Sequence, residues 1–257
     1  MPAIASHHNQ KLKEIRKLRQ RRRWRERSGR FVAEGEDLLA AADAAGWQPV
    51  ERYVAAGSGL SGTEVEPGVL VSASGLASGT RALAVYDEQW AARADGPLCI
   101  YLHGVQDPGN VGTILRGAQA FGVSSVVLGP GCADPFSPKA VRASMGAIFS
   151  VPLARTIDVA KLPGVKIALV PGQGMPLHEL WRSASSMATS SAIVREAETA
   201  GGREVALLLG AERQGLPQEV IQEADLTAHI PAANDSLNVA MAATIALYEL
   251  ANRITRA

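Results

Sequence analysis

The stretch His229-Ile-Pro-Ala-Ala-Asn-Asp-Ser-Leu-Asn238 leads directly into apolar residues at helical spacing over residues 239–250. Two more polar stretches lie upstream, Asn110-Val-Gly-Thr-Ile-Leu-Arg116 and Leu209-Gly-Ala-Glu-Arg-Gln-Gly-Leu216. Each of the three lies at the end of a predicted strand. Because ligands of open α/β sheets bind outside the carboxyl ends of the strands, the three stretches predict one ligand site.

The chain from residue 98 onward alternates fully apolar runs with amphipathic helical patterns, which is typical of a parallel sheet covered on both faces. A helix is expected over residues 111–121, and Ser137 with Pro138 predicts the start of another. The segment 171–202 is too long for an ordinary connection, so we expect a partly helical insertion or a mobile loop. Strands are predicted at residues 98–102, 125–128, 165–170, 205–209 and 228–230.

The first 90 residues predict a smaller α/β domain. Its helix is expected over residues 36–45 and ends at Gly46, where a left-handed cap fits. The polar, alanine-rich residues 91–97 end at Pro97 and are the expected linker, so the second domain spans residues 98–257. Short strands are predicted at residues 31–35, 50–55, 69–72 and 82–85.

Composition limits the class of protein. The chain has 257 residues, 47% of them hydrophobic and 20% charged, which is typical of a globular protein of one large or two ordinary domains. Its apolar runs are too short for a membrane span, and its first 20 residues lack the apolar core of a secretory signal. We therefore expect a cytoplasmic protein with no membrane partner. Cys99 and Cys132 have no metal-ligand spacing, so neither a metal site nor a disulfide is expected.

The net charge of +1 hides a strongly basic segment between Lys11 and Arg30, where eleven Lys or Arg stand against two Glu. A solvated helix usually mixes charges four residues apart, whereas Arg21-Arg22-Arg23-Trp24-Arg25 places like charges together beside an aromatic ring that can stack on a base. The segment therefore indicates phosphate contacts with RNA. A merely solvated face remains the alternative.

Two familiar nucleotide-binding motifs do not fit. Gly104-Val-Gln-Asp-Pro-Gly109 has the spacing that opens a phosphate loop, but Asn110 stands where that loop needs Lys. A Gly-x-Gly-x-x-Gly pattern does not follow any predicted strand. A P-loop ATPase and a Rossmann dehydrogenase are therefore not expected.

The three polar stretches, in order and spacing, resemble the three motifs of the SpoU family of RNA ribose 2′-O-methyltransferases, part of the SPOUT superfamily. The resemblance covers about residues 98–257 and includes Ser137-Pro-Lys139-Ala-Val-Arg142-Ala-Ser144-Met-Gly146-Ala. The N-terminal part is similar to the small L30e-like α/β substrate-binding domain that many members carry. The resemblance implies an α/β protein whose C-terminal domain has a mostly parallel sheet and a trefoil knot.

The resemblance also implies S-adenosylmethionine (AdoMet) as cofactor, a homodimer, and methyl transfer to a ribose 2′-hydroxyl of structured RNA, with ribosomal RNA preferred over transfer RNA. The alternatives are a non-catalytic RNA-binding or ribosome-assembly protein of the same fold, a tRNA 2′-O-methyltransferase, and a base methyltransferase. It implies cofactor contacts by Leu209, Gly210, Ile230, Leu237 and Asn238. It implies a reaction site of Asn110, Arg116, Glu212, Ser236 and Asn238. RNA contacts are expected from Arg21, Arg22, Arg23, Arg25, Lys139 and Arg142.

Arg116 would act as a cation that holds phosphate, because neutralising an arginine at pH 7 costs on the order of 8 kcal/mol. Structural alternatives remain open: Asn110 could cap its helix, Arg116 could be a surface residue, and Glu212 could anchor a turn. Ser236 and Asn238 could cap the last helix, and Lys139 and Arg142 could face only solvent. His103 and His229 are expected to be buried histidines without a catalytic role.

Two features depart from the family pattern. Only Ala232-Ala-Asn-Asp235 separates Ile230-Pro231 from Ser236, where members commonly have a longer loop containing glycine. The segment 171–202 is the second departure. Both bear on the geometry around the cofactor and substrate.

Overall fold

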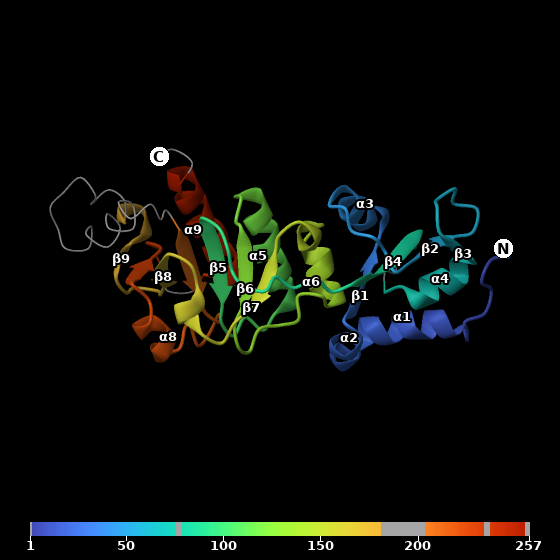
Figure 1. Cartoon of the computed structure of the whole chain (residues 1–257), viewed down its shortest axis with the longest axis horizontal. Helices are drawn as coiled ribbons and strands as arrows, with labels where there is room; N and C mark the ends of the chain where they lie inside the picture. The colour runs from blue at the N-terminus through green and yellow to red at the C-terminus, as the bar shows by residue number, and fades with distance from the viewer. Residues whose placement is uncertain (1, 76–78, 181–203, 234–236, 255–257) are drawn as a thin grey trace. The chain divides into compact units, whose positions relative to one another are not determined.

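The computed structural model describes residues 2–75, 79–180, 204–233 and 237–254, with the elements labelled in Figure 1. The chain forms two compact units. Unit 1 comprises residues 1–89 and 134–150, and unit 2 comprises residues 90–133 and 151–257. Ser236 and most of the predicted insertion 171–202 lie outside the described residues.

Unit 1 is built on a four-stranded sheet in the order β1-β4-β2-β3, in which only β2 and β3 pair in parallel. Helix α1 buries Leu12, Ile15 and Leu18 at helical spacing, and they join a core cluster on the sheet. The elements are α1 (Gln10–Gln20), α2 (Arg22–Ser28), β1 (Arg30–Glu34), α3 (Glu36–Ala44), β2 (Glu51–Ala55), β3 (Thr63–Val65), α4 (Pro67–Ala73), β4 (Ala82–Asp87), α6 (Pro138–Ala143) and the 3-10 helix η1 (Ala147–Phe149).

The segment 134–150 is the unexpected part of unit 1, because it comes from the middle of the predicted C-terminal domain. Phe136 and Phe149 pack against Phe31 of β1, with ring centroids 4.8 Å and 6.0 Å away. Trp47 donates from Nε1 to the carbonyl of Phe149 at 2.8 Å. Aromatic rings of this segment therefore complete the core of unit 1, which the spacing of apolar residues along the chain does not reveal.

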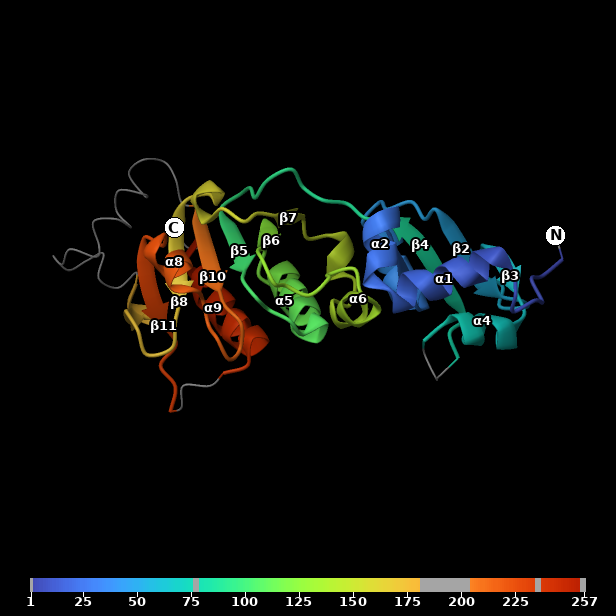
Figure 2. The same cartoon turned by 90° about the horizontal axis from the view of Figure 1, so that it is seen from below.

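Unit 2 is a seven-stranded sheet in the order β7-β6-β5-β10-β8-β11-β9, and each of its pairs is parallel. Figure 2 shows α5 and α9 on one side of this sheet, while Val220 of α8 packs into the core cluster of the other side. The elements are β5 (Leu98–Leu102), α5 (Pro108–Ala120), β6 (Ser125–Leu128), β7 (Leu153–Arg155), η2 (Val159–Lys161), β8 (Val165–Leu169), β9 (Met175–Pro176), η3 (Leu177–Glu179), β10 (Val205–Leu209), α8 (Gln218–Gln222), β11 (Leu226–His229) and α9 (Val239–Ile254).

The predicted parallel sheet is confirmed, and three of its strands have the predicted bounds. The expected strand at residues 69–72 is wrong: it lies in helix α4, which Pro67 starts and whose Val69, Leu70 and Ala73 share one buried face. The short strands β3, β7 and β9 were not predicted. Among the described helices, none is long and apolar enough to cross a membrane.

The predicted linker joins the body of unit 2. Ala91 donates its backbone N–H to Leu153 at 2.7 Å, and Arg155 lies over the ring of Trp90 at 3.8 Å. Asp95 donates its N–H to the hydroxyl of Ser125 at 3.2 Å. These contacts attach the linker to β6 and β7.

Candidate active site

A cavity of about 720 Å³ lies at the carboxyl ends of β8, β10 and β11 in unit 2. Parallel neighbours end at the same edge of a sheet, so the loops that follow these three strands meet there. Four of the five predicted cofactor-binding residues line it, namely Leu209, Gly210, Ile230 and Leu237. Asn238 lies between the lining residues Leu237 and Val239 without lining the cavity itself.

The loop after β10 is held in a tight turn against the cavity. Ala211 and Gly215 exchange backbone hydrogen bonds of 3.2 Å and 2.9 Å, and Gly215 has a φ of +67°. A Cβ on Gly210 would lie 2.1 Å from the carbonyl carbon of Gly215. Glycine at 210 therefore lets the two backbone segments touch, and their polar groups stay close to the cavity wall.

Three predicted reaction-site residues meet in one hydrogen-bonded chain, although up to 128 residues separate them in sequence. Asn110 donates from Nδ2 to Glu212 Oε1, and its Oδ1 accepts from Asn238 Nδ2 at 3.2 Å. Asn238 Oδ1 accepts the backbone N–H groups of Ala240 at 2.9 Å and Met241 at 3.3 Å. The start of α9 thus fixes Asn238, which orients the Asn110 amide toward Glu212.

These contacts decide among the structural alternatives. Asp107 caps α5 by accepting from Gly109, so Asn110 is not the cap of its helix. The side chain of Glu212 contacts Asn110 across the fold, which goes beyond anchoring a turn. Asn238 does cap α9, and it contacts Asn110 as well, so capping and site formation occur together.

Arg116 does not take part in the hydrogen bonds that connect Asn110, Glu212 and Asn238. It lies six residues after Asn110 on α5, which places the two side chains about 120° apart around the helix axis at 3.6 residues per turn. Arg116 is exposed, between buried Leu115 and half-buried Gly117. No hydrogen bond or ion pair connects its side chain to Asn110, Glu212 or Asn238, all of which are described.

The two histidines differ. His103 is half-buried, its Nδ1 lies 3.1 Å from the Tyr101 hydroxyl, and burial lowers its pKa below the usual value. His229 instead lines the cavity, with Nδ1 3.3 Å from the carbonyl of Gln173. The sequence interpretation expected His229 to be a buried histidine, and it assigned Gln173 to the insertion 171–202, so neither was predicted to line the cavity. The position of His229 at the carboxyl end of a strand was the available signal.

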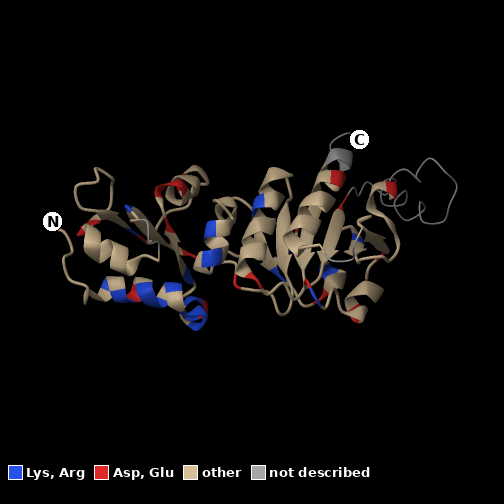
Figure 3. Ribbon diagram, turned by 180° about the vertical axis from the view of Figure 1, so that it is seen from behind, with Lys and Arg blue, Asp and Glu red and all other residues tan. Residues whose placement is uncertain are grey.

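Most lysines and arginines of unit 1 lie along α1, α2 and α6 (Figure 3). Arg21, Arg22 and Arg23 are exposed, and Arg22 also pairs with Glu26 at 2.8 Å. Trp24 is half-buried beneath Lys17, whose Nζ lies 4.4 Å from the ring centroid. Stacking of Trp24 on a base would therefore compete with a contact that the ring already makes.

Arg25 was expected to contact RNA, and the structure corrects this. Its side chain is only 5% exposed and forms an ion pair with Asp134 at 2.7 Å. Arg19 is similarly engaged with Glu34. These two arginines face inward because one side of α1 and one side of α2 pack toward the sheet. The number of Lys and Arg in the segment 11–30 therefore overstates how many of them can contact phosphate. Lys139 and Arg142 are exposed on α6.

A sequence profile described as SpoU rRNA Methylase family matches residues 97–248 of this chain. The chain belongs to the SpoU rRNA Methylase family. As a SpoU family member it is an RNA methyltransferase, so the predicted family and enzyme class are confirmed. A second profile, described as MRM3-like substrate binding domain, matches residues 9–90. The SpoU match continues through residues 134–150, which the contacts group with unit 1.

Known proteins resemble this SpoU family member over almost its whole length. The 23S rRNA (guanosine(2553)-2′-O)-methyltransferase RlmP of Bacillus subtilis is 31% identical, over 97% of this chain and 99% of its own. An AdoMet-bound rRNA methyltransferase from Sinorhizobium meliloti is 27% identical, with a TM-score of 0.80 over 98% of both chains. An RNA 2′-O ribose methyltransferase structure is 25% identical, with a TM-score of 0.74 over both full chains.

Proposed function

We propose that the protein transfers a methyl group from AdoMet to a ribose 2′-hydroxyl of ribosomal RNA. The observation that carries the proposal is the position of the Asn110–Glu212–Asn238 chain: Glu212 lines the cavity that four predicted cofactor residues surround. The solved relative from Sinorhizobium meliloti is described as AdoMet-bound, and RlmP is named for 2′-O-methylation of 23S rRNA. Both relationships support the same reaction.

The cavity suits a nucleoside-sized cofactor. Its volume of about 720 Å³ is within the range of roughly 300–1,000 Å³ for small-molecule sites. Leu209, Ile230 and Leu237 provide apolar surface, and the turn at Gly210 brings backbone polar groups to the wall. When bound, AdoMet supplies an electrophilic sulfonium methyl. Leu209, Gly210, Ile230 and Leu237 would hold it, with Asn238 beside them.

The protein's own groups then position the ribose. Glu212 is an acceptor at the cavity wall, and Asn110 stabilises its carboxylate by donating a hydrogen bond. A carboxylate in this place can accept the hydrogen bond of the 2′-hydroxyl and orient its oxygen, a gain of proximity and electrostatics. Arg116 would hold a substrate phosphate as a cation. Ser236 keeps its predicted role in the reaction site as part of the proposal.

The RNA substrate is supported by unit 1. The profile of a substrate-binding domain matches residues 9–90, which include most of unit 1, and unit 1 carries exposed cations on α2 and α6. Arg21, Arg22, Arg23, Lys139 and Arg142 would contact phosphates, which give affinity without sequence choice. The preference for ribosomal RNA follows RlmP. A cytoplasmic location stays a prediction.

We further propose a homodimer that forms through unit 2. Helix α9 exposes Met241, Ile245 and Tyr248, with 58%, 40% and 58% of each residue accessible. Their spacing of four and three residues places them on one face of the helix, and such an apolar stripe marks an interaction surface. Ile245→Glu should shift the sedimentation mass from dimer to monomer. The trefoil knot stays a prediction.

The activity is tested in two steps. Titration calorimetry should detect AdoMet binding by the protein, and absence of binding at millimolar AdoMet would favour the non-catalytic alternative. Ribosomal RNA incubated with protein and AdoMet should then gain one position resistant to alkaline hydrolysis, because only a blocked 2′-oxygen protects the adjacent phosphodiester. Methyl incorporation without hydrolysis resistance would indicate a base methyltransferase.

A further inference from the structure

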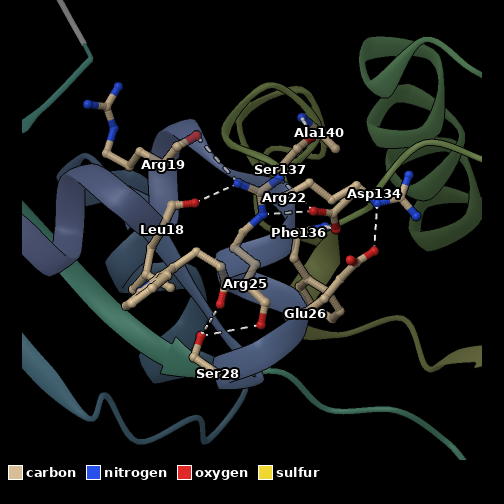
Figure 4. Close-up of polar contacts among 11 residues, drawn as sticks. Leu18, Arg19, Arg22, Arg25, Glu26, Ser28, Asp134, Phe136, Ser137 and Ala140 are labelled. Carbon is tan, nitrogen blue, oxygen red and sulfur yellow. Dashed lines mark hydrogen bonds and ion pairs between the residues drawn. The ribbon is translucent and has the colours of Figure 1, made fainter.

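The ion pair between Arg25 and Asp134 connects two parts of unit 1 that are 109 residues apart in sequence. Arg25 donates from Nε to Asp134 Oδ2 at 2.7 Å, and its Nη2 forms the ion pair with the same oxygen at 2.7 Å. Its Nη1 donates to the carbonyl of Leu18 at 2.5 Å. Asp134 Oδ1 accepts the N–H of Phe136 at 2.9 Å. Figure 4 shows these contacts converging between α2 and the start of the segment 134–150.

The pair is buried and specific in geometry. The side chains of Arg25 and Asp134 are 5% and 7% exposed. Buried ion pairs are weak contributors to net stability compared with apolar packing, but they can fix which groups lie together. Here the planar guanidinium also binds the last turn of α1, so α1, α2 and the segment 134–150 are held in one arrangement.

The two elements that this pair joins both carry exposed cations. Helix α2 and the residue before it contribute Arg21, Arg22 and Arg23, and α6 contributes Lys139 and Arg142. Helices α2 and α6 both pack against β1. Strand β1 is an edge strand, and β3 forms the opposite edge of the sheet. Both helices that carry these cations therefore contact the same edge strand of unit 1.

We propose that Arg25 is a positioning residue whose ion pair with Asp134 assembles α2 and α6 into one composite surface for the phosphate backbone of structured RNA. This inference rests on the proposed function for its RNA partner. It assigns α6, which lies between the first two SpoU motifs in sequence, to RNA recognition by unit 1. It also explains why one arginine of a basic run is withdrawn from solvent.

Tethered cleavage of RNA tests the composite surface directly. Single cysteines at Arg22→Cys and Lys139→Cys are labelled with iron–EDTA, while native Cys99 and Cys132 are buried and do not compete. Each labelled protein is bound to an in vitro transcript of bacterial 23S rRNA, and the cut nucleotides are mapped. The two probes should cut overlapping or directly adjacent backbone positions. A probe at Glu64→Cys, on β3, is the matched control and should cut elsewhere or not at all.

The positioning role is tested in the same assay. Asp134→Asn should disperse the cuts from position 139 and weaken transcript binding by about tenfold, whereas Asp87→Asn, which removes the exposed Arg30 pair of the same unit, should change neither. If Asp134→Asn fails to fold, Arg25→Lys replaces it. Asp134→Glu should restore part of the affinity. Cuts in separate RNA regions, or an unchanged pattern in both variants, would overturn the proposal.

Failure of this inference and failure of the proposed activity give different results. Tritium transfer from AdoMet to the same transcript is measured with the unlabelled protein. Methyl transfer with separate cut regions would contradict only the composite surface. Overlapping cuts without methyl transfer would contradict the activity on this RNA and support the composite surface.

Discussion

A single side chain of the candidate active site makes two kinds of contact, and Asn238 is the clearest case. Its Oδ1 caps α9, and its Nδ2 donates to Asn110. Asp at this position keeps the capping oxygen but turns a second oxygen toward Asn110 Oδ1. The Asn110 amide would then have to rotate away from Glu212. A substitution can therefore separate the structural role from the role in the site.

We predict that Asn238→Asp lowers kcat for methyl transfer by at least about a hundredfold, because the variant loses the Nδ2 donor that positions Asn110. The variant should keep the stability of the protein, because Asp also caps a helix. Asn238→Ala should also lose about 1 kcal/mol of unfolding free energy, because the cap disappears. Single-turnover kinetics and thermal denaturation measure the two effects. Full activity of Asn238→Asp would show that the Asn110 orientation is unimportant.

His103 gives a pH dependence of stability. Burial lowers its pKa in the folded protein, so below about pH 6.5 the unfolded chain takes up a proton that the folded one resists. The stability that neutral His103 contributes is fully present above the pKa of His103 in the unfolded chain. It is lost as the pH falls through the lower pKa of His103 in the folded protein. We predict that Tm falls on acidification and that His103→Gln reduces this fall. Exposed His8→Gln serves as the control, and equal acid sensitivity of both variants would contradict the assignment.

At the scale of elements, sequence patterns predicted the strands that carry the site but not all of its contacts. The apolar runs of β5, β6 and β10 have their predicted bounds because buried parallel strands need continuous apolar residues. Helix α4 was missed because Val69 and Val71 favour strands, while burial of one face favours the helix. The inward turn of Arg25 depends on Asp134, and no local pattern connects residues so far apart.

The turn after β10 should tolerate substitution at one glycine and not at the other. Gly210→Ala puts Cβ 2.1 Å from backbone, so we predict loss of about 1–3 kcal/mol in unfolding free energy and loss of AdoMet binding. Gly215 has open space around it but a φ of +67°, which Asn accepts at little cost. Gly215→Asn should therefore retain most of the affinity. Calorimetry with AdoMet compares the two variants, and equal binding would contradict the close approach.

The ion pair between α2 and the segment 134–150 should show the energetics of a buried charge. We predict that Arg25→Met costs about 3–5 kcal/mol, because it leaves Asp134 buried and uncompensated. The double variant Arg25→Met with Asp134→Leu should recover most of that loss. Urea denaturation measures both. A double variant less stable than Arg25→Met alone would mean that hydrogen bonds, rather than charge burial, dominate here.

At the scale of the whole molecule, the two units are not consecutive pieces of chain. Residues 134–150 belong to unit 1, so the chain passes between the units at three points. Phe136 and Phe149 pack with Phe31, and Trp47 and Tyr86 lie 5.2 Å and 5.1 Å from Phe149 between ring centroids. The first 90 residues alone lack two rings of their own core.

We predict that a fragment of residues 1–90 does not unfold cooperatively, because it exposes the aromatic surface that Phe136 and Phe149 cover. A chain that joins residues 1–89 to 134–150 through a glycine–serine linker should recover a sigmoidal transition and the near-ultraviolet circular dichroism of Trp47. Denaturant titrations of both chains provide the comparison. A cooperative transition in the shorter fragment would show that the segment is dispensable for folding.

The interleaving of the units also determines the order of events during protein synthesis. Residues 134–150 follow residue 89 by about 45–61 residues, so at roughly 5–20 residues per second they emerge from the ribosome several seconds after it. During that interval Phe136 and Phe149 do not yet cover Phe31, Trp47 and Tyr86. The Arg25 guanidinium also lacks its ion pair with Asp134. The nascent first 89 residues therefore expose an aromatic surface until residues 134–150 have emerged.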